Sequence, residues 1–456
     1  MEQPNRKPRK RTRMEAFKQD RLPLIIAATA VILILVFIIG SISLAVERSQ
    51  ARKRLARQEA AEQQQHALWD AQQHQVAAEA DQLMESMEYE AALAVLEAFE
   101  GDPTVYTEVG DRLEICRKAV EDMVVWNDPG KVLNLSFQML VVDTGRAFNY
   151  PVYGGPINNN FITVEEFGKI LQQLYESGYV LVDRHDIVEV QTAQDGSVTY
   201  VAKELKLPAG KKPLMLTETN ANYNTYLVDP NEDGQPDANG AGFASKLLID
   251  EEGNFVNEMM TKDGKLVRGD YDMVPILEKF IATHPGFSYR GARATIALTG
   301  MDGLFGYRDI TGADKAAAKK VADALRESGY TLACYSYANT GYATALLNDI
   351  RVELETWRQK VEPVLGKVDT FVFAQNEDLS ASGPYSGERF NALYEAGFRY
   401  FVGFCKEGST WASAHGDYFR QGRILVTAYN LKKHSQWFAG MFDTELVLDA
   451  ARPAIY

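Results

Sequence analysis

Two short polar segments, each directly after an apolar run, carry the side chains best placed for chemistry. Residues 217–220 (TETN) follow LML at 214–216, and residues 335–339 (YSYAN) follow LAC at 332–334. Chemistry in parallel α/β folds takes place beyond the carboxyl ends of the strands, where both segments are expected. The segments offer hydroxyls and amides but no imidazole. Their one carboxylate, Glu218, is expected on the opposite strand face from Thr219.

The elements that must position these segments alternate between strand and helix from residue 128 to residue 456. The sequence predicts strands over residues 132–142, 179–182, 213–217, 292–299, 331–336, 370–373 and 400–404. It predicts helices over residues 164–177, 274–283, 314–328, 346–360 and 390–396. Repeated β-then-α order with short connections indicates a parallel sheet or barrel covered by helices.

The amino-terminal region predicts a membrane anchor. Residues 22–46 contain no charged side chain, and at about 1.5 Å per residue a helix of that length crosses a hydrocarbon core of about 30 Å. Residues 1–21 form a basic tail with eight Lys/Arg and three Asp/Glu, so the amino terminus is expected in the cytoplasm and the remainder outside a plasma membrane. A cleaved signal peptide and a buried core helix are the alternatives, but the apolar run exceeds the usual signal core.

Between the anchor and the α/β region the composition favours helices. Residues 47–82 are rich in Ala, Gln, Glu and Arg without Gly or Pro, which predicts a solvated helical stalk. Residues 83–126 carry apolar side chains at spacings of three and four around a Gly-Asp-Pro turn, like a single tetratricopeptide unit. One such hairpin cannot bury its own face. We expect it to pack in cis, and a protein partner for residues 47–126 is the alternative.

Charge and cysteine content exclude some classes of function. The net charge of the whole chain is −14, and the residues after the basic tail carry about −19. Nucleic acid is therefore not an expected partner. Three cysteines, Cys116, Cys334 and Cys405, lie far apart and show no zinc-binding spacing, so buried free thiols are expected.

The two polar segments resemble the first two motifs of the NodB-type polysaccharide deacetylases, carbohydrate esterase family four. In that family one strand ends in Thr-Phe-Asp-Asp and a later strand ends in His-Ser-x-x-His. The resemblance extends over residues 128–456 and includes YESGYVLVDRHDI (175–187), PGFSYRGARATIALTG (285–300) and ADALRESGYTLACYSYAN (322–339). It implies an α/β fold of the distorted (β/α) barrel type, preceded here by a transmembrane helix and a helical stalk and hairpin.

The resemblance also implies which positions have lost their chemistry. In the family the first Asp is the base, and the second Asp and two His hold a divalent metal of the zinc type. The matching residues here are Thr219 for the base, Asn220 for the carboxylate ligand, and Tyr335 and Asn339 for the imidazoles. Neutral amides and hydroxyls are poor zinc ligands, and a threonine cannot take a proton near neutral pH. The expected cofactor is therefore none, and we expect no deacetylase activity.

A deacetylase-shaped surface protein without its metal can still bind an N-acetylated polysaccharide of the cell wall or surface. Thr219 and Asn220 would line a neutral groove with Gln375 and Asn376. The aromatic candidates for stacking on sugar rings are Tyr335, Tyr337, Tyr385 and Trp411.

Two other functions stay open from the sequence. One is an active polysaccharide N-deacetylase with an atypical ligand set drawn from Glu218, Asp302 and Asp378. The other is a surface scaffold that binds a protein through its stalk and hairpin.

A separate acidic loop has part of the pattern of a calcium site. Asp229, Asn231, Asp233 and Asp237 fall at positions 1, 3, 5 and 9 of an EF-hand-like loop with Gly234 at position 6. The bidentate Glu expected at position 12 is absent. A solvated acidic turn is the favoured interpretation, and a weak calcium site is the alternative.

Overall fold

The computed structural model describes residues 13–381 and 383–456, and the chain divides into two compact units. One unit takes in the chain up to Val76 together with residues 99–110, and the other takes in residues 77–98 and 111–456. Most of the predicted basic tail, residues 1–12, lies outside the described residues.

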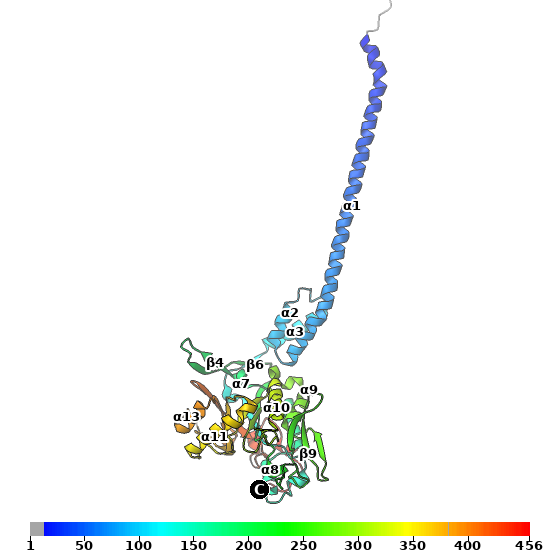
Figure 1. Ribbon diagram of the computed structural model, residues 1–456. Helices are drawn as coiled ribbons and strands as arrows, with labels where there is room; N and C mark the ends of the chain where they lie inside the picture. The colour runs from blue at the N-terminus through cyan, green and yellow to red at the C-terminus, as the bar shows by residue number, and fades with distance from the viewer. Residues whose placement is uncertain (1–12, 382) are drawn as a thin grey trace, which may run out of the picture. The chain divides into compact units, whose positions relative to one another are not determined.

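Helix α1 runs without a break from Arg13 to Glu85 (Figure 1). Its uncharged stretch, residues 22–46, is exposed, and α1 is the one helix in the described part of the chain that is long and apolar enough to cross a membrane. The sequence predicted a separate anchor and stalk. The two form one helix because residues 47–82 contain good helix formers and neither Gly nor Pro.

The helical hairpin is divided differently from the prediction. Helix α1 ends before Met87, which has a left-handed backbone with φ +60°, and helices α2 (Tyr89–Glu97) and α3 (Thr107–Glu121) follow. The N–H of Glu88 bonds the Leu83 carbonyl at 2.8 Å and closes the end of α1. The first predicted helix of the hairpin, which starts at residue 83, is therefore divided between the end of α1 and α2.

Contacts within the second unit join the start of the hairpin to the α/β region in cis. Lys206 Nζ lies 2.8 Å from Glu90 Oε1, and Arg290 Nε lies 3.4 Å from Glu88 Oε2. After the hairpin, β1 (Val124–Trp126) pairs antiparallel with β6 (Leu205–Leu207).

Parallel strands close into a barrel at the centre of this unit. Each strand pairs with the next in the order β7, β11, β12, β13, β14, β16, β2, and β2 pairs again with β7. Their bounds are Leu133–Phe137 (β2), Lys212–Thr219 (β7), Thr295–Leu298 (β11), Thr331–Cys334 (β12), Thr370–Val372 (β13), Tyr400–Phe404 (β14) and Tyr418–Leu425 (β16). Strand β3 (Tyr179–Leu181) pairs with the first half of β7. The predicted α/β barrel is confirmed.

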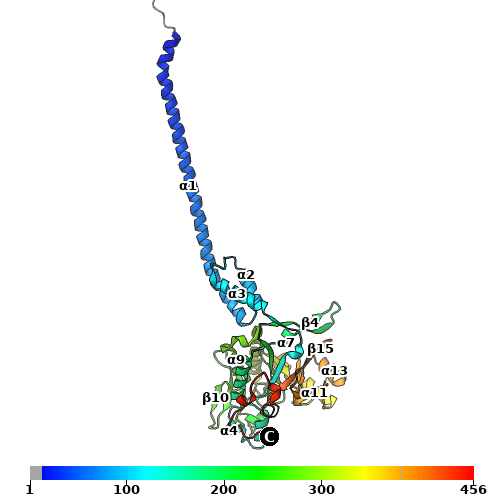
Figure 2. The ribbon, with the colours of Figure 1, turned by 180° about the vertical axis from the view of Figure 1, so that it is seen from behind.

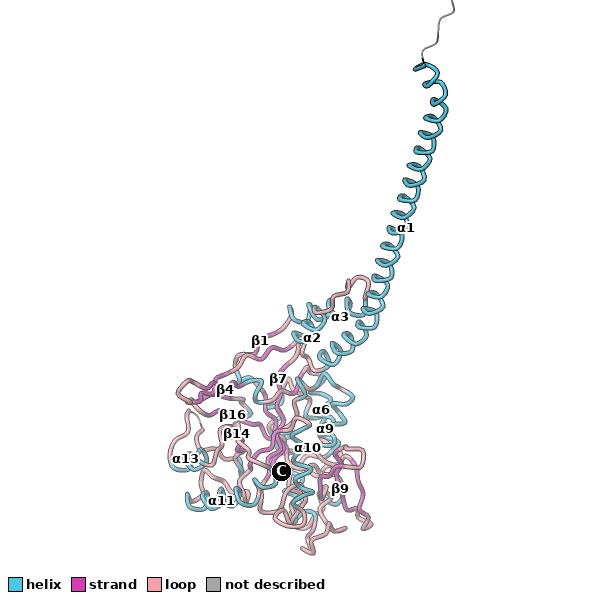
Figure 3. The backbone as a smooth tube through the Cα atoms, turned by 45° about the horizontal axis from the view of Figure 1, so that its top comes forward, coloured by secondary structure: helices cyan, strands magenta, loops and turns pink. Residues whose placement is uncertain are grey.

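Helices cover the barrel between its strands. They include α6 (Val164–Glu176), α9 (Met273–Thr283), α10 (Lys315–Glu327), α11 (Leu347–Lys360) and α13 (Glu388–Glu395), each within two residues of its predicted bounds. Figure 3 shows β7, β14 and β16 between α11 and α13 on one side and α6, α9 and α10 on the other. The chain ends beside α5 (Gly154–Asn160), where Asn158 Nδ2 donates to the Pro453 carbonyl at 3.2 Å. Figure 2 marks this C-terminus on the α/β unit.

Some strands were not predicted. The sequence missed β16, which completes the barrel, and it overextended β2, which ends at Phe137 rather than Val142. It also missed the hairpin of β4 (Val188–Thr192) and β5 (Val198–Ala202) and the antiparallel sheet of β8 (Lys246–Ile249), β9 (Phe255–Met260) and β10 (Leu266–Gly269). Most of these additions have an exposed face, so they lack the continuous apolar runs of buried parallel strands.

The two faces of the barrel wall differ in chemistry. The outer face carries the large apolar core under the helices, with residues such as Leu216, Ile296, Leu332 and Phe371. The register places Asn134, Thr217 and Gln421 on the other face, which lines the lumen. In the lumen the Thr217 hydroxyl donates to Asn134 Oδ1 at 3.0 Å, and Asn134 Nδ2 donates to Gln421 Oε1 at 3.3 Å.

Candidate functional site

The loops at the carboxyl ends of the barrel strands hold several non-glycine residues in left-handed backbone conformations. With φ between 56° and 62°, these residues are Asn220, Ser336, Asn339, Gln375, Asn376 and Glu407. L-residues avoid this region because Cβ crowds the backbone, and such conformations gather at functional sites. This end of the barrel, the barrel mouth, is therefore the candidate site.

The four polar positions compared with a metal site in the sequence lie at or just beyond the carboxyl ends of β7 and β12, the two strands that flank β11. The Thr219 hydroxyl donates to the Phe137 carbonyl at 3.0 Å, and the Asn220 N–H bonds the Ala297 carbonyl at 2.8 Å. Tyr335 is buried, and the Asn339 carbonyl accepts a hydrogen bond from Gln375 Nε2 at 3.1 Å. The strands thus carry all four positions to the same end of the barrel.

Their donor set does not fit a zinc-type metal. The positions offer a hydroxyl, two amides and a phenol. The hydroxyl, that of Thr219, already donates a hydrogen bond to a backbone carbonyl. Across the described residues, no three His, Cys, Asp or Glu side chains come together as a metal site. Zinc in proteins takes imidazole, thiolate and carboxylate ligands.

A fixed cation stands in the barrel beside one of these positions. Arg423 on β16 is fully buried, and its guanidinium carbon lies 6.0 Å from the centroid of the Tyr335 ring. Its Nη atoms donate to the carbonyls of Phe373 at 2.9 Å and of Gly403 at 3.0 Å, at the ends of two other strands. Burial lowers the pKa of Arg423, and a hydrogen bond with Tyr335 opposes that shift.

This cation is unusual because no carboxylate of the described chain forms an ion pair with it. Fully buried arginines are normally paired. Its Nε atom is buried without a hydrogen-bond partner, as is Oδ1 of Asn220. A divalent ion near Tyr335 would meet this positive charge at short range and in a poorly solvated place.

The nearest carboxylate in sequence, Glu218, is unavailable to the lumen. It lies on the outer face of β7 and is buried against Asp272, which precedes α9. Burial, the charge of Asp272 and a hydrogen bond with it raise the pKa of Glu218 well above its usual value. Burial also raises the pKa of Asp272 to about 6. The other two alternative ligands are engaged elsewhere, because Asp302 accepts from the Thr225 N–H and Asp378 accepts from Arg420.

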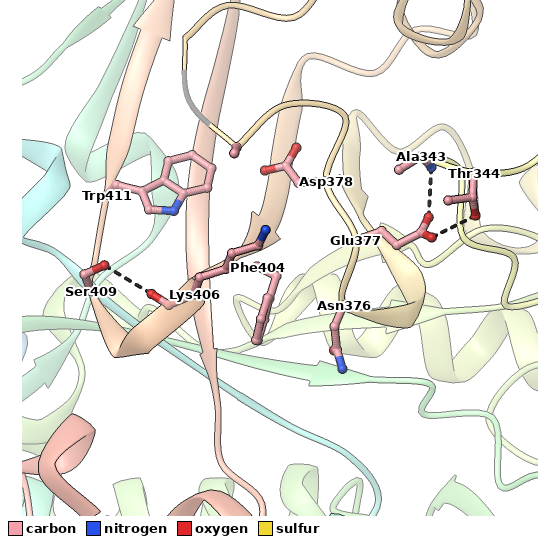
Figure 4. Close-up of a pocket in the computed structure, with 10 residues that line it drawn as sticks. Ala343, Thr344, Asn376, Glu377, Asp378, Phe404, Lys406, Ser409 and Trp411 are labelled. Carbon is pink, nitrogen blue, oxygen red and sulfur yellow. Dashed lines mark hydrogen bonds between the residues drawn. The ribbon is translucent and has the colours of Figure 1, made fainter. Parts of the chain in front are cut away.

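A cavity of about 400 Å³ opens at the mouth near the ends of β13 and β14 (Figure 4). The residues that line it include Ala343, Thr344, Asn376, Glu377, Asp378, Phe404, Lys406, Ser409 and Trp411. None of the four mapped metal-site positions lines this cavity. The cavity is linked to them through adjacent residues, since Gln375 bonds Asn339 and Asn376 is in the lining.

Most polar groups of the cavity are held by the protein itself. Glu377 accepts from the Ala343 N–H at 2.9 Å and from the Thr344 hydroxyl at 2.8 Å. Asp378 accepts from Arg420 Nη2 at 2.9 Å and from the Tyr385 hydroxyl. Lys406 is exposed, and Figure 4 shows its side chain extending between Trp411 and Asp378.

The structure distributes the predicted sugar-binding residues unevenly. Asn376 and Trp411 line the cavity, and Gln375 is exposed next to it. Tyr385 is only 5% exposed and its ring packs 4.2 Å from the Arg420 guanidinium, so it offers no open stacking surface. Tyr337 is half-buried under Lys360, and Tyr335 is buried in the lumen.

Comparisons with known proteins add little to this site. No protein-family model and no curated protein matches the chain. Among solved structures, it is similar to the Streptococcus pyogenes deacetylase PplD in complex with acetate, with 12% identity, a TM-score of 0.35, and coverage of 67% of this chain and 96% of that chain. It is also similar to a 4-alpha-glucanotransferase from Thermococcus litoralis, with 12% identity, a TM-score of 0.23, and coverage of 36% of this chain and 26% of that chain. Similarities of this size carry no argument about the site.

The acidic loop is held together by its own backbone. Asp229 accepts from the N–H groups of Asp233 at 3.2 Å and of Gly234 at 2.9 Å, and the Asn231 side-chain oxygen also accepts from Asp233 N–H. Asp237 accepts from the Asn239 N–H at 2.8 Å. These bonds are those of an acidic turn. Calcium binding by this loop stays a prediction.

The sequence missed several residues of the site. Lys406, Glu377 and Phe404 show no motif, and they meet only because β13 and β14 are neighbours in the barrel. Arg423 was also missed, because β16 was not predicted.

Proposed function

We propose that this chain is a membrane-anchored, polysaccharide-deacetylase-like protein that binds a glycan at the barrel mouth and does not carry out metal-dependent deacetylation. The single observation that carries this proposal is the buried guanidinium of Arg423 beside Tyr335. It puts a permanent positive charge next to Tyr335, the position where polysaccharide deacetylases have a histidine that binds the metal ion.

The chemistry of deacetylation supports the loss of activity. Cleaving an acetamide requires an activated water, a group that polarises the carbonyl, and an acid for the leaving amine. Thr219 cannot act as the base, and Glu218 is sealed behind the barrel wall with Asp272. The guanidinium cannot act as a base toward water, because it stays protonated, and its Nη atoms are held by the carbonyls of neighbouring strands.

The cavity supports glycan binding. It combines an indole, a phenyl ring, an amide and an ammonium group, from Trp411, Phe404, Asn376 and Lys406, and the ammonium forms no ion pair with another described residue. Sugar rings present apolar C–H faces that pack on aromatic rings and hydroxyls that bond to polar groups at the edge. The cavity volume of about 400 Å³ lies within the range for small-molecule sites and suits one or two sugar rings.

The proposed location follows from α1. Its apolar stretch would span the plasma membrane once, and the excess of Lys/Arg before it supports an amino terminus in the cytoplasm and a barrel outside.

Binding of N-acetylglucosamine oligosaccharides to the full chain in detergent tests the proposal. Trp411→Ala is expected to weaken binding about five- to thirtyfold, the effect of losing an aromatic contact of about 1–2 kcal/mol. Trp69→Ala, which removes an indole from the first unit, is the matched control and should leave affinity unchanged. Equal affinity in the native chain and the Trp411 variant, or no binding by the native chain, would contradict glycan recognition at this cavity.

A further inference from the structure

The part of α1 directly after the candidate membrane span has one basic face. The face is an open groove between the side chains of this one exposed helix, lined by Ala45, Arg48, Ser49, Arg52, Lys53 and Ala56. At about 100° per residue these positions fall within roughly 140° of the helix circumference. Small side chains form the floor, and three long cationic side chains rise around it.

The cations of this face have no partner within the described chain. Arg48, Arg52 and Lys53 are exposed, and none of them forms an ion pair with another described residue. Residues 47–57 contain five Lys/Arg against one acidic residue, Glu47, which at about 100° per residue falls on the opposite side of the helix from this face. Unpaired cations on a rigid helix favour an anion supplied from outside the chain.

The distance of these cations from the apolar stretch indicates the source of that anion. With a rise of about 1.5 Å per residue, Arg48 lies about 3 Å beyond Val46, and Arg52 and Lys53 lie about 9–10 Å beyond it. The headgroup layer on each side of a bilayer is about 5–8 Å thick, and charges act over a Debye length of about 8–10 Å. When residues 22–46 span the membrane, this face is at the level of the lipid phosphates.

We propose that the face formed by Ala45, Arg48, Ser49, Arg52, Lys53 and Ala56 binds the phosphate of an anionic phospholipid headgroup in the leaflet that borders Val46. The inference rests on the membrane anchoring proposed above. The small side chains at positions 45, 49 and 56 leave room for the headgroup, and the guanidinium groups of Arg48 and Arg52 suit phosphate oxygens. The site is continuous with the span, so the lipid needs no other contact to reach it.

Lipid selection by the full chain tests this assignment. The chain would be reconstituted in bilayers of equal phosphatidylcholine and phosphatidylglycerol, extracted gently, and the retained lipids counted by mass spectrometry. The native chain is expected to retain more phosphatidylglycerol than the bulk ratio. Each cation near an anionic surface contributes roughly fivefold, so Arg48→Gln with Arg52→Gln should reduce the enrichment by up to roughly twenty-fivefold.

The matched control removes the same charge from other sides of the helix, in Arg54→Gln with Arg57→Gln, and should retain most of the enrichment. An equal loss of phosphatidylglycerol enrichment in both double variants would show a general charge effect and would overturn binding at this particular face. No enrichment in the native chain would overturn lipid binding altogether. Resistance of each variant to carbonate extraction is measured in parallel. A native chain that carbonate releases from the membrane would contradict the membrane anchor itself. A native chain that stays anchored but shows no lipid preference would contradict this inference alone.

Discussion

The two faces of the barrel wall each bury charged groups, and the chain handles them in opposite ways. On the inner face Arg423 keeps its proton and shares its donors among strand-end carbonyls. On the outer face Glu218 and Asp272 lie together, and burial raises the pKa of both carboxyls, so the pair holds a proton. A buried cation therefore remains on the lumen face of the barrel wall, while the carboxyl pair is enclosed on the helix-covered face. Strand alternation, with a period of two residues, decides this difference.

Removing the inner cation has the largest expected effect. Arg423→Ala would leave the Phe373 and Gly403 carbonyls without donors and open a cavity, which should lower the free energy of unfolding by about 3–5 kcal/mol. Arg423→Met keeps most of the volume without the charge and should cost less. Urea unfolding followed by tryptophan fluorescence compares the two. Equal and small losses would show that the guanidinium does not hold the strand ends together.

The outer carboxyl pair should make stability depend on pH. Because the folded chain holds its protons to higher pH than the unfolded chain does, stability should fall as pH rises above the ordinary value of 4.5 for Glu218. Glu218→Gln removes the titrating proton and should flatten this dependence, with a gain of about 1–3 kcal/mol near pH 8. Unfolding curves from about pH 5 to about pH 8 check this. The exposed Glu251→Gln is the control, and a slope shared by all three proteins would contradict the shared proton.

The polar lumen offers a smaller test. Thr217→Val removes the hydroxyl that donates to Asn134 but keeps the shape, so about 1 kcal/mol of stability should be lost. Thr225→Val, which removes a hydroxyl from the Asp302 contact outside the lumen, gives a comparison of similar size. A gain in stability from Thr217→Val would indicate that the lumen does not need its hydrogen-bond network.

The smallest expected effect concerns Lys406. It is exposed, and its side chain reaches into the cavity rather than into the core, so Lys406→Gln should change stability by less than about 0.5 kcal/mol. Affinity for a glycan that carries a carboxylate should nevertheless fall severalfold, because the one open cation of the cavity lining is lost. Calorimetry with matched neutral and acidic oligosaccharides separates the two effects. An equal loss of affinity for the neutral and the acidic oligosaccharide would show that Lys406 does not recognise the carboxylate.

Much of this arrangement was predictable from residue patterns, and the exceptions have physical reasons. Apolar runs and helix spacing predicted most barrel strands and covering helices, because buried parallel strands and amphipathic helices leave strong signals. The face of Glu218 followed from alternation alone. The cavity did not, because its lining comes from loops after three strands whose order in the barrel is set by tertiary pairing. Tyr385 was expected to meet a sugar, but the Arg420–Asp378 ion pair draws it into the core.

The most direct test of the central claim is the metal content of the purified full chain grown with added zinc, measured together with acetate release from chitin oligosaccharides. The donor set of Thr219, Asn220, Tyr335 and Asn339 beside the Arg423 cation predicts far less than one metal per chain and no acetate above background. One metal per chain, lost on substitution of Asn220 or Asn339 and accompanied by acetate turnover, would contradict the account.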